Sequence, residues 1–376
     1  MPNSLLDGIG LFQMTVPQMM MILISILLAY LAIKKKYEPL LLLPIAFGML
    51  LANLPMPQSL GLPGFSAYDE GGLLYYLYQG IAKGVYPPLI FLCLGVMTDF
   101  GPLISNPKSA FIGLGGQLGI FAALGAALLL GFKPEEAAAV AIIGSSDGPT
   151  AIFAAKALAE DLLPTIAIAA YSYMALIPII QPPIMRMLTT SKERVIVMPE
   201  PKRVTQRQRI IFPVAMTVVT LLLVPSAGLL ISMLMLGNLI KESGVTERYV
   251  RSLQNEALNI LTLLIGISIG ATATAEKVLT IKTIMIIGLG LLAFSFGTVG
   301  GVLIAKLLCK LTGGKVNPLI GNSGVSAMPM AARVSQKLGQ EYDPNNYLLM
   351  HAMGPIVSST IGSAIIAGLF IAYFGR

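Results

Sequence analysis

The sequence predicts an all-α polytopic membrane protein with about ten transmembrane helices and two additional broken segments. Three features point to this fold class: long apolar runs, few charged residues, and two apolar stretches interrupted by Gly, Ser and Pro. Of the 376 residues, 55% are hydrophobic and 11% are charged. Many apolar runs approach the roughly 20 residues that span a bilayer, which a soluble fold does not need.

The expected crossings follow from the apolar runs taken in chain order. The first run lacks the basic start and small-residue cleavage site of a signal peptide, so we expect it to remain as a membrane helix. Two stretches, 137–158 and 318–338, are apolar but broken, as re-entrant segments of transporters are. Full crossings are expected at residues 16–33, 37–54, 85–97, 110–130, 163–188, 210–224, 227–240, 257–270, 284–308 and 347–374.

The net charge of +7 is predicted to orient the chain in the membrane rather than to bind nucleic acid. With the amino terminus outside, most basic residues fall in inner loops, and Lys277 and Lys282 are the exception. The basic residues expected inside are Lys34, Lys35, Lys36, Lys108, those of 186–209, Lys241, Arg248, Arg251, Lys306, Lys310 and Lys315. The acidic residues expected outside are Asp69, Glu70, Glu135 and Glu136.

An internal repeat divides the chain into two halves. An ungapped shift of 177 residues superposes GSSDGPTAIFAAK, residues 144–156, on GNSGVSAMPMAAR, residues 321–333. In the predicted orientation the first broken segment enters from outside and the second from inside, so the repeats are inverted. We expect an elevator-type core and scaffold, with halves 1–190 and 210–376 joined by a basic cytoplasmic linker, 191–209.

The two interruptions predict a binding site. Unpaired backbone groups are costly in hydrocarbon, so irregular backbone at membrane depth lies in protein or lines a wet cavity. The first interruption offers carbonyl oxygens, the hydroxyls of Ser145, Ser146 and Thr150, and the carboxylate of Asp147. These hard oxygen ligands suit Na⁺ or a proton. A purely structural ion pair of Asp147 with a nearby cation is the alternative.

Other polar residues near the interruptions have more than one interpretation. Ser326 is either a ligand or a small packing residue. Lys156 and Arg333 occupy equivalent positions, where they pair with Asp147, bind an anionic group or extend to the headgroups. Tyr173, two positions after Tyr171, is a proton or hydrogen-bond donor, or a tyrosine of the membrane interface.

Function remains open at this point between several classes. His351, the single histidine, with the serine of GNSG at 321–324 would form a protease dyad, although a protease has no need of the repeat that carries Asp147. A passive cation or proton antiporter fits the architecture. No Walker-type GxxxxGK occurs, so the chain does not drive transport with ATP by itself.

Four motifs add a family resemblance. They are GSSDGPT at 144–150, NPLIGNSGVSAMPMAARVS at 317–335, KYEPLLLLPIAFG at 36–48 and MHAMGP at 350–355. With them the whole chain resembles the beta subunit of the sodium-pumping biotin-dependent decarboxylases, which act in oxaloacetate, methylmalonyl-CoA or glutaconyl-CoA decarboxylase complexes. One departure is Ile356, where relatives often carry Asn.

The resemblance implies that the chain decarboxylates carboxybiotin and couples this reaction to Na⁺ export, as a translocase. It implies Asp147, Ser326, Asn317 and Gly321 as sodium-site residues, and Arg333 and Asn317 as residues that bind carboxybiotin. The implied catalytic residues are Tyr173 as proton donor, with Arg333 and Ser326.

The resemblance also implies partners. Because no Met-Lys-Met acceptor loop occurs in this chain, carboxybiotin must come from a biotin carrier subunit. Further implied partners are a soluble carboxyltransferase subunit and a small single-span membrane anchor subunit, with the beta subunits packed as a trimer. The implied location is the bacterial cytoplasmic (inner) membrane, crossed several times.

Overall fold

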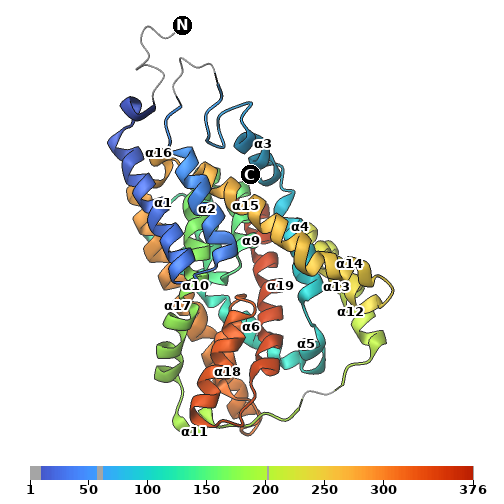
Figure 1. Cartoon of the computed structure of the whole chain (residues 1–376). Coiled ribbons are helices and arrows are strands. Elements are labelled where there is room, and N and C mark those ends of the chain that lie inside the picture. Colours follow the sequence, from blue (N-terminus) through green and yellow to red (C-terminus); the bar gives the residue numbers. More distant parts are fainter. Residues whose placement is uncertain (1–9, 57–61, 201–202, 376) are drawn as a thin grey trace.

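The computed structural model describes residues 10–56, 62–200 and 203–375, which form helices and connecting loops without any β-strand. Most long helices run between two ends of the molecule (Figure 1). One end carries the start of α1 (Val16–Lys34) and α16 (Ala275–Val278). The other carries α11 (Ser191–Arg194) and α18 (Met330–Tyr342). We name them the outer and the inner end, after the predicted orientation.

Five helical stretches in the described part of the chain are long and apolar enough to cross a membrane. Two bent helix pairs raise this number to seven if each pair forms one span. Large apolar side chains such as Leu23, 67% exposed, face outward from α1, as expected for contact with lipid. The five stretches are Val16–Lys34, Pro107–Leu129, Glu247–Thr272, Ile281–Leu311 and Leu349–Phe374, and the bent pairs are Leu73–Ala82 with Tyr86–Met97 and Glu160–Met174 with Leu176–Leu188.

Three of the expected crossings form helices that are shorter or less apolar than a full span. These are α2 (Pro39–Ala52), α12 (Gln206–Leu223) and α13 (Gly228–Ser243). The predicted linker 191–209 is also partly helical, because it contains α11 and the start of α12. The chain is thus a helical multi-pass membrane protein, and the count of ten crossings stays a prediction.

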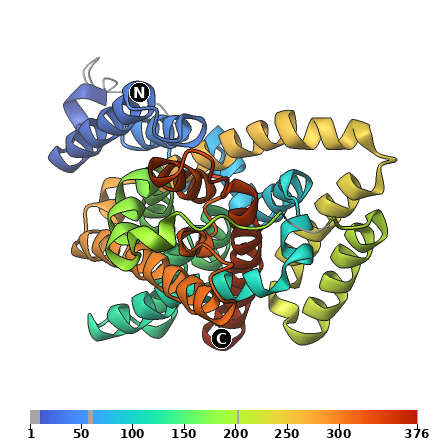
Figure 2. The same cartoon turned by 90° about the horizontal axis from the view of Figure 1, so that it is seen from below.

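The remaining helices connect these stretches or build them. Seen from the inner end, α1 lies at one side, α12 and α13 lie at the opposite side, and the red α19 lies between them (Figure 2). The bounds are α3 (Leu73–Ala82), α4 (Tyr86–Met97), α5 (Gly101–Ser105), α6 (Ala110–Gly116), α7 (Leu118–Leu129), α8 (Pro134–Ala141), α9 (Gly148–Leu158), α10 (Leu163–Leu188), α14 (Glu247–Ser252), α15 (Leu258–Thr272), α17 (Ile281–Leu311) and α19 (Leu349–Phe374).

The first predicted break occurs between α8 and α9. A 3-10 turn, η5 (Ile142–Ser145), ends at Ser146 with a left-handed φ of 56°, and Asp147 then caps α9. The segment begins and ends at the outer end, because its flanks pair with α16 and with the first turn of α17. Lys282 contacts Glu136 at 2.7 Å, and Lys277 contacts Asp161 at 3.0 Å.

These two ion pairs also account for the basic residues that departed from the charge pattern. Lys277 and Lys282 lie at the same end as the acidic flanks of the first broken segment, as the predicted orientation requires. Each lysine is paired with a carboxylate, so neither adds an unpaired positive charge to the outer end.

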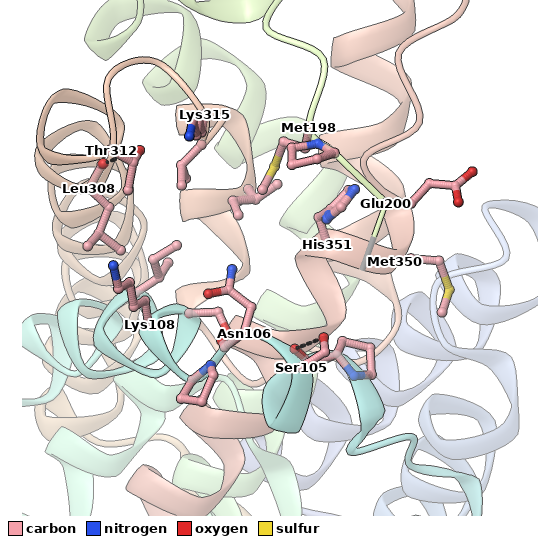
Figure 3. Close-up of a pocket in the computed structure, with 17 residues that line it drawn as sticks. Ser105, Asn106, Lys108, Met198, Glu200, Leu308, Thr312, Lys315, Met350 and His351 are labelled. Carbon is pink, nitrogen blue, oxygen red and sulfur yellow. Dashed lines mark hydrogen bonds between the residues drawn. The ribbon is translucent and has the colours of Figure 1, made fainter. Parts of the chain in front are cut away.

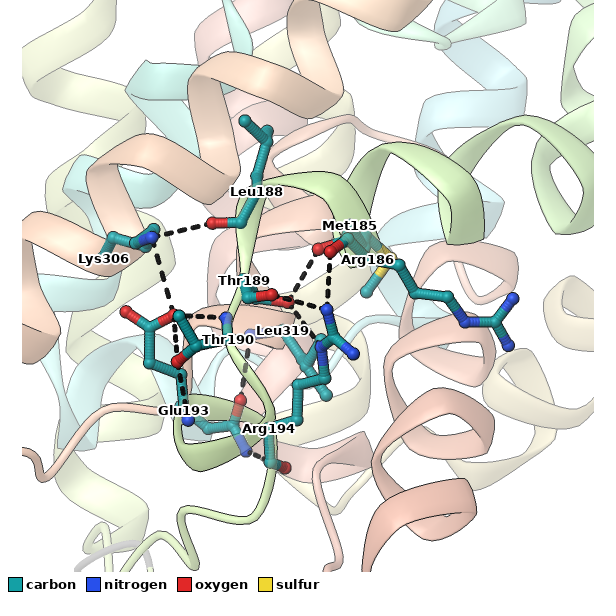
Figure 4. Close-up of polar contacts among 10 residues, drawn as sticks. Met185, Arg186, Leu188, Thr189, Thr190, Glu193, Arg194, Lys306 and Leu319 are labelled. Carbon is teal, nitrogen blue, oxygen red and sulfur yellow. Dashed lines mark hydrogen bonds and ion pairs between the residues drawn. The ribbon is translucent and has the colours of Figure 1, made fainter.

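The second predicted break follows η9 (Pro318–Gly324), a 3-10 turn that gives way to extended backbone at Val325 before α18. The residues before and after this segment are held at the inner end by hydrogen bonds to a single carbonyl oxygen. The side-chain amides of Asn317 and Asn346 each donate to the carbonyl oxygen of Arg194 at 3.0 Å. The Arg194 side chain in turn donates to Thr189 Oγ1 at 2.9 Å, within a group of polar contacts that also includes Lys306 and Glu193 (Figure 4).

The tips of the two broken segments meet inside the helix bundle. The backbone N–H of Ser326 donates to the carbonyl oxygen of Ser145 at 2.8 Å. Beside this contact α6 approaches η9 so closely that a Cβ atom on Gly116 would lie 1.7 Å from the carbonyl oxygen of Gly324. Glycine at 116 is therefore required for the close approach of α6 to η9.

Candidate functional site

A cavity of about 240 Å³ lies where the two tips meet. Its lining includes Asp147 and Ser146 of the first interruption and Ser326 of the second. Helices α2, α4, α10, α13, α15 and α19 supply the other walls, most of which are apolar. The structure therefore brings Asp147 and Ser326, predicted from separate halves of the sequence, to one cavity.

Asp147 is held by hydroxyl groups rather than by a cation. Its Oδ2 atom accepts hydrogen bonds from Thr150 Oγ1 at 2.7 Å and from Ser363 Oγ at 3.0 Å. The side chain is 5% exposed, and none of the ion pairs in the described part of the chain includes it. A buried carboxylate without a counter-charge is costly in an apolar setting, so the site is suited to receive a cation.

Ser146 supplies an oxygen atom that the protein itself does not use. Its Oγ atom is buried and has no hydrogen-bond partner within the described residues. Buried polar atoms are nearly always paired, so an unpaired hydroxyl beside a carboxylate in the wall of a cavity indicates a place for a ligand. The left-handed backbone of Ser146 holds it immediately before Asp147.

Ser326 belongs to a chain of polar side chains that crosses the core. Its Oγ donates to Ser359 Oγ at 3.0 Å, and Gln117 Nε2 donates to the same Ser359 oxygen at 2.9 Å. Gln117 Oε1 is a second buried atom without a partner in the described part of the chain. The network joins the second interruption to α19 and to the helical stretch of α6 and α7.

The two tyrosines of α10 have different surroundings. Tyr171 lines the cavity, and its ring packs on the residue after Asp147, since a Cβ atom on Gly148 would lie 2.6 Å from the Tyr171 hydroxyl oxygen. That hydroxyl makes no hydrogen bond to any described residue. Tyr173 instead donates to the carbonyl oxygen of Ile287 on α17 and does not line the cavity.

Asn317 and Gly321 lie in η9 or at its start, outside the cavity. The Asn317 side chain donates to two inner-end carbonyl oxygens and accepts from the Leu319 amide at 2.9 Å. A Cβ atom on Gly321 would lie 2.4 Å from Val302 Cα, so this residue packs directly on α17. Their predicted part in binding sodium stays a prediction.

The two predicted cations of the repeat do not contact Asp147. Lys156 pairs with Glu160 at 2.5 Å, near the outer end. Arg333 lies on the exposed face of α18, where it borders a shallow depression at the inner end together with Gln336 and Leu349. Arg333 is therefore open to an anionic ligand that arrives from the inner side.

His351 lines a different cavity, of about 480 Å³, at the inner end (Figure 3). Lys108 and Lys315 border the same cavity. The serine of the GNSG sequence, Ser323, hydrogen-bonds to Asn322 Oδ1 at 3.3 Å, and no hydrogen bond joins it to His351. The geometry therefore provides no Ser-His dyad.

Sequence reasoning missed the contribution of α19 to the site. Ser359, Thr360 and Ser363 all face the polar interior, where Ser363 donates to Asp147 across 216 positions of sequence. The signal was present: SSTIGS, residues 358–363, places four hydroxyl groups in the middle of an otherwise apolar 26-residue helix. Hydroxyls buried within a membrane span need polar partners.

The ligand set favours a small hard cation. The site offers one carboxylate with several hydroxyl and carbonyl oxygens, a set that suits an alkali ion or a proton. The described residues contain no group of three or more His, Cys, Asp or Glu side chains that would hold a transition metal.

Comparison with known proteins agrees with this chemistry. The family described as the Na⁺-transporting oxaloacetate decarboxylase beta subunit matches residues 17–374. The chain belongs to this family.

Its relatives are similar along their full length. The methylmalonyl-CoA decarboxylase subunit beta of Propionigenium modestum is 50% identical over 383 residues, with 97% of each chain covered. The glutaconyl-CoA decarboxylase subunit beta of Acidaminococcus fermentans is 50% identical, with 99% of this chain and 97% of the relative covered. The oxaloacetate decarboxylase beta chain of Klebsiella pneumoniae is 44% identical, with 99% and 98% covered.

The family defines the activity in general terms. The chain is the beta subunit of a Na⁺-translocating decarboxylase and couples the decarboxylation of carboxybiotin to Na⁺ transport. It acts within a complex of several subunits.

Proposed function

We propose that the transported Na⁺ binds in the cavity between the two interruptions, with the Asp147 carboxylate as its main ligand. The unpaired Oγ of Ser146 carries this proposal, because it is a buried oxygen beside the carboxylate that lacks a partner of its own. Ser326, from the other half of the chain, lines the same cavity, and its backbone N–H donates to the carbonyl oxygen of Ser145. Together these oxygens replace part of the hydration shell of the ion.

The carboxyl group arrives at the inner end. Carboxybiotin is delivered by a biotin carrier subunit and carries a carboxylate, which Arg333 orients from the exposed face of α18. When the bond between the ureido nitrogen and the carboxyl carbon breaks, carbon dioxide leaves and the nitrogen takes up one proton. A tyrosine of α10 supplies this proton, and Tyr171 is better situated for the role than Tyr173, because it borders the cavity.

Transport follows from the arrangement of the two halves as inverted repeats. One bundle carries both broken segments and shifts against a scaffold, so the cavity opens alternately to each end. Moving one positive charge against 100 mV costs about 2.3 kcal/mol, so the shift must depend on decarboxylation to prevent back-flow. The segment ends fixed at Arg194 and at the Lys277–Lys282 loop are consistent with two broken segments that enter from opposite sides.

The complex is completed by other subunits. A soluble carboxyltransferase loads the carrier, a small single-span subunit anchors the assembly, and the beta subunits pack as a trimer in the bacterial cytoplasmic membrane. The acyl substrate is determined by the carboxyltransferase, because the relatives of this chain act with three different substrates at similar identity.

The experiment that tests this function measures ²²Na⁺ accumulation in vesicles that contain the chain with its anchor subunit. Free carboxybiotin should drive accumulation, and withholding it should stop accumulation. A proton gradient that drives the same Na⁺ movement without carboxybiotin would indicate an antiporter and would contradict the proposal.

A further inference from the structure

A second carboxylate, Glu38, lines the cavity that holds Asp147 and Ser326. Glu38 belongs to the turn between α1 and α2, so it comes from outside both broken segments. It is the residue before the first turn of α2, and it lies on the same cavity wall as Leu40 and Leu41. The proposed sodium site thus has an acidic group on a neighbouring helix pair that the proposed function does not use.

The backbone of Glu38 is unusual for a residue with a side chain. Its φ of 37° and ψ of 58° lie in the left-handed region, which favours Gly or Asn. A residue that precedes a helix commonly caps it with its side chain, but Glu38 makes no such hydrogen bond. The conformation therefore brings no capping benefit, and residues held in sparsely populated regions often have functional roles.

The Glu38 side chain is half-buried and has no ion pair or hydrogen bond with any described residue. The Glu38 carboxyl group lies within the electrostatic field of the Arg333 guanidinium. Arg333 is thus near enough to act on Glu38 through its field, although the two form no ion pair. A carboxylate without a hydrogen bond or ion pair of its own is free to attract a cation that enters the cavity.

Residues from the first turns of α15 also line the cavity. Asn259 is exposed and lines the cavity, and the Thr262 hydroxyl bonds to its own helix at Leu258 O with a distance of 2.7 Å. Asp147 lies deeper, with 5% of its surface exposed. Glu38 and Asn259 are therefore the polar groups at the mouth of the cavity, and Asp147 and Ser146 are those at its bottom.

We propose that Glu38 is the carboxylate through which Na⁺ enters the Asp147 cavity from the inner end. The inference rests on the proposed role of Asp147 as sodium ligand. A negative charge at the mouth of a low-dielectric cavity concentrates cations there and lowers the barrier to dehydration. Glu38 is in this sense a positioning residue for the transported ion, while Asp147 remains its ligand.

The test compares steady-state kinetics of Na⁺-dependent carboxybiotin decay in the purified complex. Glu38→Gln should raise the apparent KM for Na⁺ roughly tenfold, while kcat at saturating Na⁺ stays within about twofold. Glu38→Asp keeps the charge and tolerates the left-handed backbone, so its KM for Na⁺ should lie between those of the wild type and Glu38→Gln. Glu200→Gln is the matched control, because Glu200 borders the other inner-end cavity and should leave both constants unchanged.

Two outcomes would overturn the inference. One is a KM for Na⁺ that is unchanged in Glu38→Gln, and the other is a loss of kcat that added Na⁺ does not restore. If Glu38→Gln does not assemble, Glu38→Asn replaces it under the same two criteria, because Asn also lacks the charge and tolerates the left-handed backbone. The parallel variant Asp147→Asn separates the two proposals. If Asp147→Asn keeps normal Na⁺ dependence, the sodium site itself is refuted. If Asp147→Asn loses Na⁺ dependence while Glu38→Gln keeps a normal KM for Na⁺, only the role of Glu38 is refuted.

Discussion

Ser326 N–H donates a hydrogen bond of 2.8 Å to the carbonyl oxygen of Ser145, although the two residues lie 181 positions apart. This contact joins the tips of two broken segments, of which one is fixed at the outer end and the other at the inner end. Because each tip contributes oxygen atoms to one cavity, a shift of either segment changes the coordination of an ion between them.

Ser146→Ala should weaken Na⁺ binding without reducing the stability of the protein. The Ser146 hydroxyl has no partner within the described residues, so its removal breaks no internal hydrogen bond. We expect an increase of about 3- to 30-fold in the KM for Na⁺, which corresponds to the roughly 0.5–2 kcal/mol of one ligand interaction. Sodium-dependent decay and thermal unfolding of the same preparation are the measurements. A lower unfolding temperature with unchanged KM would mean that the hydroxyl is structural.

Replacement of the two α10 tyrosines should distinguish their roles. Tyr171→Phe removes a free hydroxyl that borders the cavity and should slow carboxybiotin decay by roughly 10²-fold, as expected for loss of a general acid. Tyr173→Phe removes a hydrogen bond to Ile287 and should lower stability by about 1 kcal/mol with little change in turnover. Single-turnover decay rates at saturating Na⁺ provide the comparison. If Tyr173→Phe slows decay more than Tyr171→Phe does, Tyr173 is the proton donor.

Gly116→Ala should separate the second broken segment from α6. The new Cβ atom would lie 1.7 Å from the carbonyl oxygen of Gly324, a distance that forces the backbone to shift. We expect a loss of at least about 2 kcal/mol of stability, together with loss of Na⁺-dependent turnover. Gly125→Ala, in α7, is the matched control: no atom lies within 4 Å of its Cβ position, so stability should stay equal or rise. Equal melting temperatures of the two variants would refute this account of the α6 contact.

Sodium should stabilise the protein in the absence of turnover. A ligand that binds only the folded state adds about 2.7 kcal/mol at a concentration one hundred times its Kd. Thermal unfolding of the purified complex should therefore shift upward with NaCl and not with equal KCl. An identical shift with both salts would mean a general salt effect rather than a sodium site.

The sequence alone could predict the features of the fold and site that depend on residues close together in the chain. Clusters of Gly, Ser and Pro within the apolar stretches identified both interruptions, whereas single prolines such as Pro44 and Pro355 lie inside continuous helices. The count of crossings placed Lys277 and Lys282 at the outer end against the charge pattern, and their carboxylate partners Asp161 and Glu136 became evident only from the contacts.

The parts that sequence could not predict depend on packing between distant helices. Tyr171 and Tyr173 contact different neighbours because residues two positions apart lie on nearly opposite sides of a helix, and the local sequence pattern does not say which one faces Asp147. Ser363 and Glu38 reach the site from elements far along the chain. Their roles required knowledge of which faces of α19 and α2 are turned inward.

The most direct test is isothermal titration of Na⁺ into the purified complex, in wild type and in Asp147→Asn. A cavity built by the two interruptions around Asp147 predicts saturable Na⁺ binding in the wild type and none in Asp147→Asn, with both proteins folded. Equal Na⁺ binding by the two proteins would contradict the assignment of the site.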